Sequence, residues 1–490
     1  MTGKDIIVVG SGFGGLAAAA LLAKDDNNVT VLEKNDQPGG RAQVWREKGF
    51  VFDMGPSWYL MPDVFERFFQ EFGKKPEDLM DLLRLDPHYR VIYSDETVLD
   101  ISSELKKNFK LFDSLEKNGG EKLKKYLENS EYQYKIAMEK FLYKDYKHLT
   151  DFFNWKMIKD GRKFHVFDNL DHYVGRFFEN IKLKQILEYN IVFLGGAPKN
   201  SPALYSLMSH VDFNLGVWYP KGGMSALVNA MYELAKEQGA EFKFDQEVKR
   251  IKVENKTVKN VVTEKESFNA DVFIMNADFA HVDLNLLGLR HRSYSEKYWD
   301  KRKIAPSAVL LYLGFDKQLR NLQHHNLYLQ VNWEPHFKTL FNDPRWPEEP
   351  CIYICCPTKT DSSVAPKGCE NIFILVPVAS DLDDTDGVRE KYLKWSMKLL
   401  EKITGEKLQE HLIVKRIFSH RDFKSNYNAY KGTALGLAHT LRQTAIFRPQ
   451  HKSKKLKNLY YTGHYNHPGI GVPMVIISSQ IVADLIKNNH

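Results

Sequence analysis

Three glycines near the N-terminus are spaced in a way that suits the binding of a dinucleotide. Gly10, Gly12 and Gly15 form a G-x-G-x-x-G pattern directly after the apolar run 4–9 and before the helix-forming run 16–22. The first glycine permits a tight turn, the second lets the backbone approach a pyrophosphate, and the third lets the helix pack closely on the strand. A lone pattern of this kind is weak, but its place between a buried strand and a helix N-terminus predicts a dinucleotide site.

An acidic residue and an arginine extend this site. A second predicted strand, 29–32, ends at Glu33, whose carboxylate can accept hydrogen bonds from both ribose hydroxyls and would repel the 2′-phosphate of NADP. Gly39 and Gly40 follow and let the backbone approach a ligand. Arg41 can then contact phosphate or flavin oxygens, and its alternative role is an ion pair at the surface or between domains.

The blocks that follow carry a family resemblance. The stretch from Val8 to Pro62, which contains Gly55 and Pro56, resembles the N-terminus of FAD-dependent amine-oxidase-type flavoproteins. Within that superfamily it is most similar to the bacterial phytoene-type carotenoid desaturases. Further blocks of the same resemblance follow in family order, at 195–198, 218–224, 361–369 and 459–473. The likeness therefore extends over nearly the whole chain.

The resemblance implies an α/β fold with three parts. A discontinuous Rossmann-type FAD-binding domain is expected, together with a substrate domain built on a mixed sheet and a helical part that associates with membranes. The expected boundaries are 1–73, 218–285 and 415–490 for the FAD-binding domain, 74–118 and 286–414 for the substrate domain, and 119–217 for the helical part.

The same resemblance implies non-covalent FAD binding, mainly by residues of the first and the last of these blocks. The expected set is Gly10, Gly12, Gly15, Glu33, Gly40, Arg41, Gly55, Pro56, Val248, Gly463, Gly471, Val472 and Met474. Val248 would contact adenine through its backbone, and the amides of Val472 and Met474 would reach a flavin oxygen. His464 and His467 are expected to face the reacting end of the substrate and to position it.

The implied reaction is the desaturation of a carotenoid, in which a C=C bond forms as one hydrogen passes as hydride to flavin N5 and its neighbour leaves as a proton to a base or to water. The substrate is expected to be phytoene-type, or a hydroxylated or monocyclic carotene (such as the γ-carotene type) desaturated at its 3,4 bond. An apolar tunnel would hold it. No second nucleotide pattern is present, so quinone or oxygen is the expected electron acceptor. Two alternatives stay open: another amine-oxidase-like flavin oxidase, or a non-catalytic isoprenoid-binding protein similar to GDP-dissociation inhibitors.

For several other side chains, a functional role and a purely structural role both remain open. The candidate proton acceptors Asp151, Asp168 and Glu188 are more often surface carboxylates. His324 and His325 resemble a family position near the tunnel, but adjacent histidines are often simple loop residues. Tyr205, Trp218 and Tyr219 suit either the substrate side of the flavin or ordinary core packing.

Composition argues against nucleic acids and metal ions as binding partners. The 490 residues include 69 basic and 62 acidic side chains, and a net charge of +7 is too small to predict nucleic-acid binding. The four cysteines do not have the spacing of a two-pair zinc site, so no metal is expected.

Neither a secretory leader nor a long apolar run is present, which predicts a cytoplasmic protein without a transmembrane helix. Aromatic and basic residues mixed over Lys140–Phe164 predict peripheral attachment to a membrane surface, and their alternative is a solvated basic face.

Hydrophobic periodicity predicts the elements that must position these residues. A helix is expected over 225–239, strands over 247–253, 258–262, 270–277, 307–313 and 371–378, and a largely helical segment over 121–200.

Overall fold

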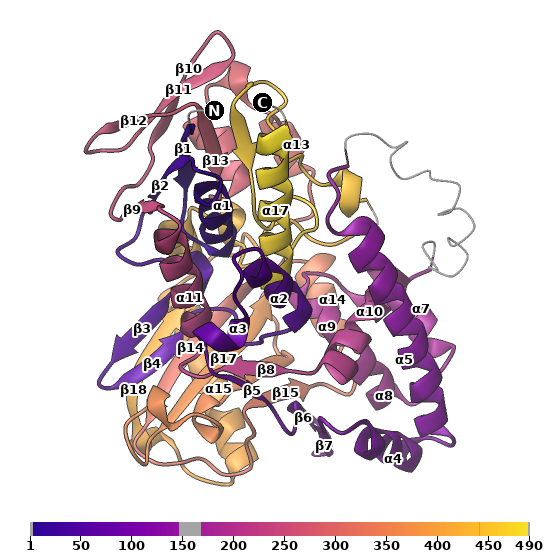
Figure 1. Cartoon of the computed structure of the whole chain (residues 1–490). Helices are drawn as coiled ribbons and strands as arrows, with labels where there is room; N and C mark the ends of the chain where they lie inside the picture. The colour runs from indigo at the N-terminus through magenta and orange to yellow at the C-terminus, as the bar shows by residue number, and fades with distance from the viewer. Residues whose placement is uncertain (1–2, 147–167, 441, 489–490) are drawn as a thin grey trace.

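A computed structural model describes residues 3–146, 168–440 and 442–488 of the chain. The two largest sheets lie at opposite ends of the molecule, and a group of helices lies to one side of them (Figure 1). The first sheet lies near both chain termini, and the second is larger and more distant from them.

The first sheet has five parallel strands in the order β19-β13-β1-β2-β9. These strands are β1 (Asp5–Val9), β2 (Asn28–Leu32), β9 (Glu241–Lys243), β13 (Val272–Met275) and β19 (Leu459–Tyr461). They come from three separate parts of the chain. All four residues of β13 are buried, as is typical of a parallel strand covered on both faces.

Three helices pack around this sheet. They are α1 (Phe13–Ala23), α11 (Met224–Glu237) and α17 (Val472–Asn488), and α1 contacts both of the others. Every residue of α1 is buried, and the small side chains of the run 17–20 let the neighbouring helices approach closely. α11 is the helix expected over 225–239, and Gly239 follows it with a φ of 102°.

The second sheet has seven strands in the order β18-β14-β17-β16-β15-β6-β7. They are β6 (Tyr89–Tyr93), β7 (Val98–Ile101), β14 (Ser307–Phe315), β15 (His325–Leu329), β16 (Ile352–Cys355), β17 (Glu370–Val378) and β18 (Leu412–Phe418). Only β15 and β6 pair in parallel, so the sheet is mixed. β18 is hydrogen-bonded to β14, so the domain boundary expected at 415 falls inside a strand, and 412–418 belong to this seven-stranded sheet.

Two predicted strands are shorter than expected: β13 covers only the middle of the strand predicted over 270–277, and a second strand starts late. The strand predicted over 247–253 begins only at Arg250, as β10 (Arg250–Glu254), which pairs with β11 (Thr257–Val262). The backbone N–H of Gln246 donates to the carbonyl of Glu33 at 2.8 Å. This bond holds residues 246–248 beside the end of β2. There they line a cavity and do not extend the β10–β11 hairpin.

The helices at the side come mainly from the segment expected to be helical. They include α5 (Gly119–Ile136), α7 (Leu170–Gly175), α8 (Ile181–Glu188), α9 (Asn190–Phe193) and α10 (Leu207–His210). None of the helices in the described ranges combines the length and the apolar character needed to span a bilayer. The segment proposed for membrane attachment, Lys140–Phe164, lies outside the described residues from position 147 onward.

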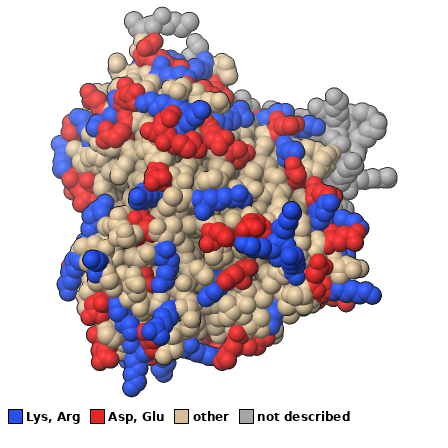
Figure 2. All heavy atoms as spheres, turned by 60° about the horizontal axis from the view of Figure 1, so that its bottom comes forward, with Lys and Arg blue, Asp and Glu red and all other residues tan. Residues whose placement is uncertain are grey.

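Charged side chains of both signs are interspersed on the face seen in Figure 2. This surface has no broad field of one sign, which agrees with the small net charge of +7.

Candidate functional site

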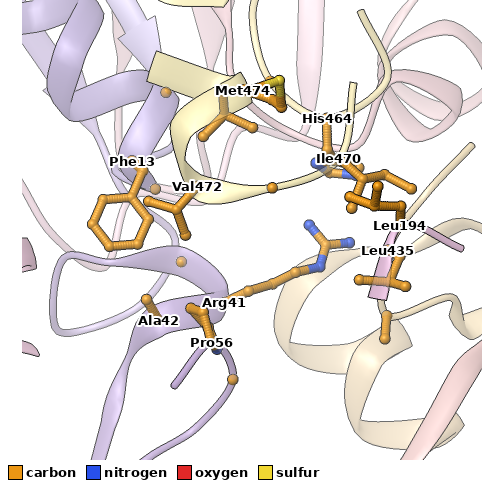
Figure 3. Close-up of a pocket in the computed structure, with 18 of the residues that line it drawn as sticks. Phe13, Arg41, Ala42, Pro56, Leu194, Leu435, His464, Ile470, Val472 and Met474 are labelled. Carbon is orange, nitrogen blue, oxygen red and sulfur yellow. The ribbon is translucent and has the colours of Figure 1, made fainter. Parts of the chain in front are cut away.

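A cavity of about 910 Å³ reaches from the ends of the parallel strands to the larger sheet. Its walls include the residues that follow β1, β2, β13 and β19, and the first residues of α1 and α17. The carboxyl ends of parallel strands are where open α/β sheets bind ligands. Figure 3 shows this region, with Phe13 and Val472 on one side and Leu194 and Leu435 on the other.

The glycine turn forms one wall through its backbone. Gly10, Gly12 and Gly40 line the cavity, and Gly10 has a φ of 96°. A Cβ on Gly40 would lie 3.1 Å from the Cα of Gly12, so the two loops meet without side chains between them. Gly15 does not line the cavity; a Cβ there would lie 1.9 Å from the carbonyl oxygen of Gly10, so this glycine lets α1 pack on the turn.

Glu33 is buried at the end of β2 and lines the same cavity. Its Oε2 accepts hydrogen bonds from the backbone N–H and the hydroxyl of Ser11, both at 2.7 Å. Its Oε1 accepts from the backbone N–H of Asn35 at 2.9 Å and from the side-chain amide at 3.1 Å. These bonds fix the carboxylate beside the glycine turn, where a ribose would lie next to a pyrophosphate.

Arg41 extends into the cavity and ends near His464 (Figure 3). Its Nε and Nη2 are buried without a hydrogen-bond partner in the part of the chain that the structure describes. Its guanidinium carbon lies 5.6 Å from the centroid of the Tyr427 ring. Two buried guanidinium nitrogens without acceptors are costly, so this side chain fits an anionic or oxygen-rich ligand such as FAD.

The turn before α17 forms the opposite wall. Gly463 and Gly471 both have a φ of 121°, and both line the cavity together with Val472 and Met474. A Cβ on Gly471 would meet nothing closer than the Cγ of Met474 at 3.6 Å, so its positive φ, and not crowding, requires glycine. The first N–H groups of α17 have no acceptors within the helix and are available to a ligand oxygen.

The remaining predicted cofactor contacts also line the cavity. Gly55, Pro56 and Val248 belong to its walls. A Cβ on Gly55 would lie 2.2 Å from the carbonyl oxygen of Arg41, so the two loops are in close backbone contact. The structure therefore gathers every predicted cofactor residue except Gly15 around one space.

His464 and His467 both line the cavity, and desolvation lowers the pKa of each ring enough to keep it neutral. Burial lowers the pKa of His467 to about 3, and its Nε2–H donates to the carbonyl of Phe141 at 3.1 Å. Burial, followed by the charges of Arg41 and Arg448, holds the pKa of His464 well below its usual range. Both rings are therefore polar but uncharged parts of the wall.

Arg448, which was not identified from the sequence, holds the loop 464–466 in place through hydrogen bonds. Arg448 is 3% exposed, and burial lowers its pKa to about 10. Its guanidinium donates to five backbone carbonyls, those of Leu437, Gln443, His464, Tyr465 and Asn466, at 2.6 to 3.2 Å. An arginine in a polar loop gives no local sign of such a role.

A second missed residue is Asn276, which follows β13 and lines the cavity. Its Nδ2 donates to the carbonyl of Gly10 at 3.2 Å and so ties the glycine turn to the neighbouring strand end. Its position at the carboxyl edge of a buried strand was the available sign.

The end of the cavity away from the glycine turn is apolar. Its side chains come from α9, from η5 (Ala203–Ser206), from α10, from β14 and β17, and from η13 (Ala445–Phe447). They include Val192, Leu194, Leu204, Leu207, Met208, Leu310, Leu375 and Ile446. Tyr205 also lines this end, and its hydroxyl is hydrogen-bonded to Nδ1 of His439.

Other predicted residues lie elsewhere. Trp218, Tyr219, His324 and His325 do not line this cavity. The candidate bases do not line it either: Asp168 is paired with His172 and Arg176, and the burial of Glu188, which raises its pKa to about 8, occurs away from the cavity. Asp151 lies outside the described residues.

Comparison with known proteins agrees with this geometry. The flavin containing amine oxidoreductase family matches residues 13–487. A carotenoid 3,4-desaturase of Haloarcula japonica is 44% identical over 487 residues, covering 99% of this chain and 98% of the relative. A zeta-carotene-forming phytoene desaturase of Myxococcus xanthus is 32% identical, covering 98% and 93%.

A solved oxidoreductase from Methanosarcina mazei shares the fold, with a TM-score of 0.63 and 16% identity over 98% of this chain and 100% of that one. The buried, unpaired guanidinium of Arg41 and the glycine-lined walls fit FAD, which is the cofactor of this chain. The chain belongs to the flavin containing amine oxidoreductase family and, within it, to the carotenoid desaturases.

Proposed function

We propose that this chain is an FAD-dependent desaturase that introduces a double bond at the 3,4 position of a carotenoid end group. The observation that carries the proposal is the continuity of the cavity, which joins a glycine-lined cofactor end to an apolar end. The 3,4 position is favoured over the phytoene-type reaction by the 44% identity to the Haloarcula enzyme against 32% to the phytoene desaturase.

FAD, when bound, supplies a hydride acceptor. The chain would hold it through the glycine turn, Glu33, Arg41 and the first turn of α17. The apolar walls would align the polyene and exclude water, which is the main task for a substrate with few polar groups. The neutral rings of His464 and His467 would position the reacting end without placing a charge beside it.

We also propose that the protein works in the cytoplasm at a membrane surface, because its substrate does not dissolve in water. Phe447 lines the cavity and is 49% exposed, so the cavity wall continues to the molecular surface at this side chain. Lys140–Phe164, with its aromatic and basic side chains, supplies the proposed contact with lipid headgroups. Quinone or oxygen is the proposed electron acceptor.

The proposal is tested by expressing the chain in cells that accumulate different carotenes. Lycopene-type, hydroxylated and monocyclic substrates are compared with phytoene, and products are identified by mass and absorption spectrum. We expect the loss of two hydrogens from an end group, with phytoene unchanged. Conversion of phytoene alone would overturn the assignment of the bond, and no conversion of any carotene by FAD-loaded protein would overturn the function.

Membrane attachment is tested separately by sedimentation with liposomes that contain anionic lipids. We expect a variant with serine in place of Phe152, Phe153 and Trp155 to remain in the supernatant while the wild-type chain sediments. Equal sedimentation of both, with FAD retained in both, would exclude this segment as the anchor.

A further inference from the structure

Two histidines and a cysteine form a compact buried cluster that the proposed reaction does not use. His324 precedes β15, His325 is the first residue of β15, and Cys355 is the last residue of β16 and lies opposite His325. Their exposed fractions are 4%, 0% and 3%. One nitrogen from each histidine and the cysteine sulfur all lie within 4.8 Å of one another.

The hydrogen bonds of the two rings leave one nitrogen of each for a ligand. Nδ1 of His324 lies 2.8 Å from the hydroxyl of Thr360, and Nδ1 of His325 lies 2.7 Å from the hydroxyl of Tyr353. Both hydroxyls can accept a bond from Nδ1–H, which places the lone pair on Nε2. In both rings Nε2 is buried and has no hydrogen-bond partner in the described part of the chain. Metal-bound histidines are held in this way, with the second nitrogen donating to an oxygen.

Aromatic contacts fix the orientation of both rings. Trp58 stacks on His325 with a centroid separation of 4.3 Å and an interplanar angle of 8°. The ring of Tyr219 lies edge-on to His324 at 4.5 Å. Side chains held in this way are already ordered before an ion binds, so they lose little further conformational freedom on binding.

The donor set selects the kind of ion. Two imidazoles and one thiolate suit thiophilic d¹⁰ ions, whereas hard ions such as Mg²⁺ and Ca²⁺ prefer oxygen. One thiolate balances the charge of Cu⁺, and the nearby carboxylate of Asp361, which acts electrostatically on His324, would offset the second charge of Zn²⁺. We propose that His324, His325 and Cys355 bind a thiophilic metal ion, Cu⁺ or Zn²⁺. The thiol proton of Cys355 leaves to solvent as the sulfur binds the ion.

The site adjoins the cofactor cavity without opening into it. The hydroxyl of Tyr353 also bonds the hydroxyl of Ser57 at 2.7 Å, and both of these residues line the cavity. The ion would therefore stabilise the wall that carries Gly55 and Pro56. This inference does not depend on the desaturase proposal, because it concerns metal content and not turnover.

The experiment measures metal bound to the full-length, FAD-loaded protein. Separate samples are incubated with Zn²⁺ or, without oxygen, with Cu⁺, then desalted, and both metal and FAD are measured per chain. We expect about one ion per chain with at least one of the two metals. His324→Ala, His325→Ala and Cys355→Ser should each lower this content roughly tenfold or more.

Cys356→Ser is the matched control. Cys356 is also fully buried, but it packs on the opposite side of the sheet from Cys355 and lies 3.6 Å from the hydroxyl of Thr358. The Cys356→Ser variant should keep the wild-type metal content. In a separate measurement, X-ray absorption of the metal-loaded wild type should show one sulfur and two nitrogen ligands.

FAD occupancy reports folding in every variant, and the two histidine variants carry the test if Cys355→Ser does not fold. Fewer than about 0.1 ion per wild-type chain with both metals, or equal metal content in the folded cluster variants and Cys356→Ser, would overturn the proposal.

Discussion

The two ends of the cavity are built in different ways. The cofactor end is made mostly of backbone, from glycine turns and the first residues of two helices, with Glu33 and Arg41 as its charged side chains. The apolar end is made mostly of leucine, methionine and valine side chains that come from separate helices and from β14 and β17 of the seven-stranded sheet.

This difference determines how each end responds to mutation. Where two backbone segments are in close contact, as at Gly40 and Gly55, the wall has no room for a side chain, so a single methyl group there should disrupt cofactor binding. Side-chain walls tolerate exchange of one apolar residue for another of similar volume, so the apolar end should change its selectivity before it loses function.

The largest effect is expected for Gly15→Ala. The new Cβ would lie 1.9 Å from the carbonyl oxygen of Gly10, so α1 cannot stay packed on the turn. We expect loss of bound FAD and a destabilisation of more than ~4 kcal/mol, measured by flavin absorbance after gel filtration and by urea unfolding. Gly175→Ala is the control, because its Cβ would meet only the flexible Nζ of Lys184 at 3.7 Å. FAD retained by Gly15→Ala would show that the turn has more room than the structure gives it.

Removal of the unpaired guanidinium should have the next largest effect. Arg41→Ala deletes a charged partner for an oxygen of FAD, and we expect a loss of about 1.5–3 kcal/mol, or roughly 10- to 150-fold in FAD affinity. Titration of apoprotein with FAD measures this change. Arg46→Ala, which removes an exposed arginine of the same region, should leave the affinity unchanged. If both variants bind FAD with equal affinity, Arg41 does not contact the cofactor and serves only the folded structure.

The cofactor end was largely predictable from the sequence because its geometry is local. Gly10, Gly12 and Glu33 lie in one strand–turn–helix–strand unit whose spacing is fixed by the chemistry of a dinucleotide. Their burial and bonds around one cavity agree with that prediction.

The apolar end was not predictable, because its residues share no local pattern. Leu194 and Leu375 are 181 positions apart in the chain, and only the three-dimensional fold brings them to one cavity. The roles of Arg448 and Asn276 likewise depend on contacts with distant backbone, so periodicity and motif spacing do not report them. The start of β10 was misplaced for a similar reason, since a bond from Gln246 to Glu33 bends the chain before the strand.

A change of volume at the apolar end separates the two ends most sharply. Leu207→Trp should fill part of the cavity and lower the rate of desaturation roughly tenfold while FAD affinity stays at the wild-type value. Leu207→Met, which keeps the volume nearly constant, is the control. Turnover in carotenoid-loaded liposomes and FAD titration provide the two readouts. A parallel loss of FAD in Leu207→Trp would show that the two ends are not independent.

The smallest effect concerns the pH dependence of stability. The pKa of His467 is about 3 in the folded chain, below its ordinary value of 6.5, so the folded ring stays neutral while the unfolded ring takes up a proton. Its contribution to stability is complete above pH 6.5 and falls by ~1.4 kcal/mol per pH unit below it, until pH 3. Between pH 7 and 5.5 we expect the wild type to lose about 1 kcal/mol more than His467→Gln in urea unfolding. Parallel pH profiles would mean that this wall of the cavity is hydrated.

The most direct test of the continuous cavity is anaerobic mixing of the FAD-loaded protein with a carotenoid in liposomes. If the two ends form one site, the flavin absorbance should bleach as a product two hydrogens lighter appears, in equal amounts. Bleaching should slow in Leu207→Trp with FAD fully bound. Product formation without bleaching, or a flavin that stays oxidised while the carotenoid is bound, would contradict the proposed arrangement of cofactor and substrate.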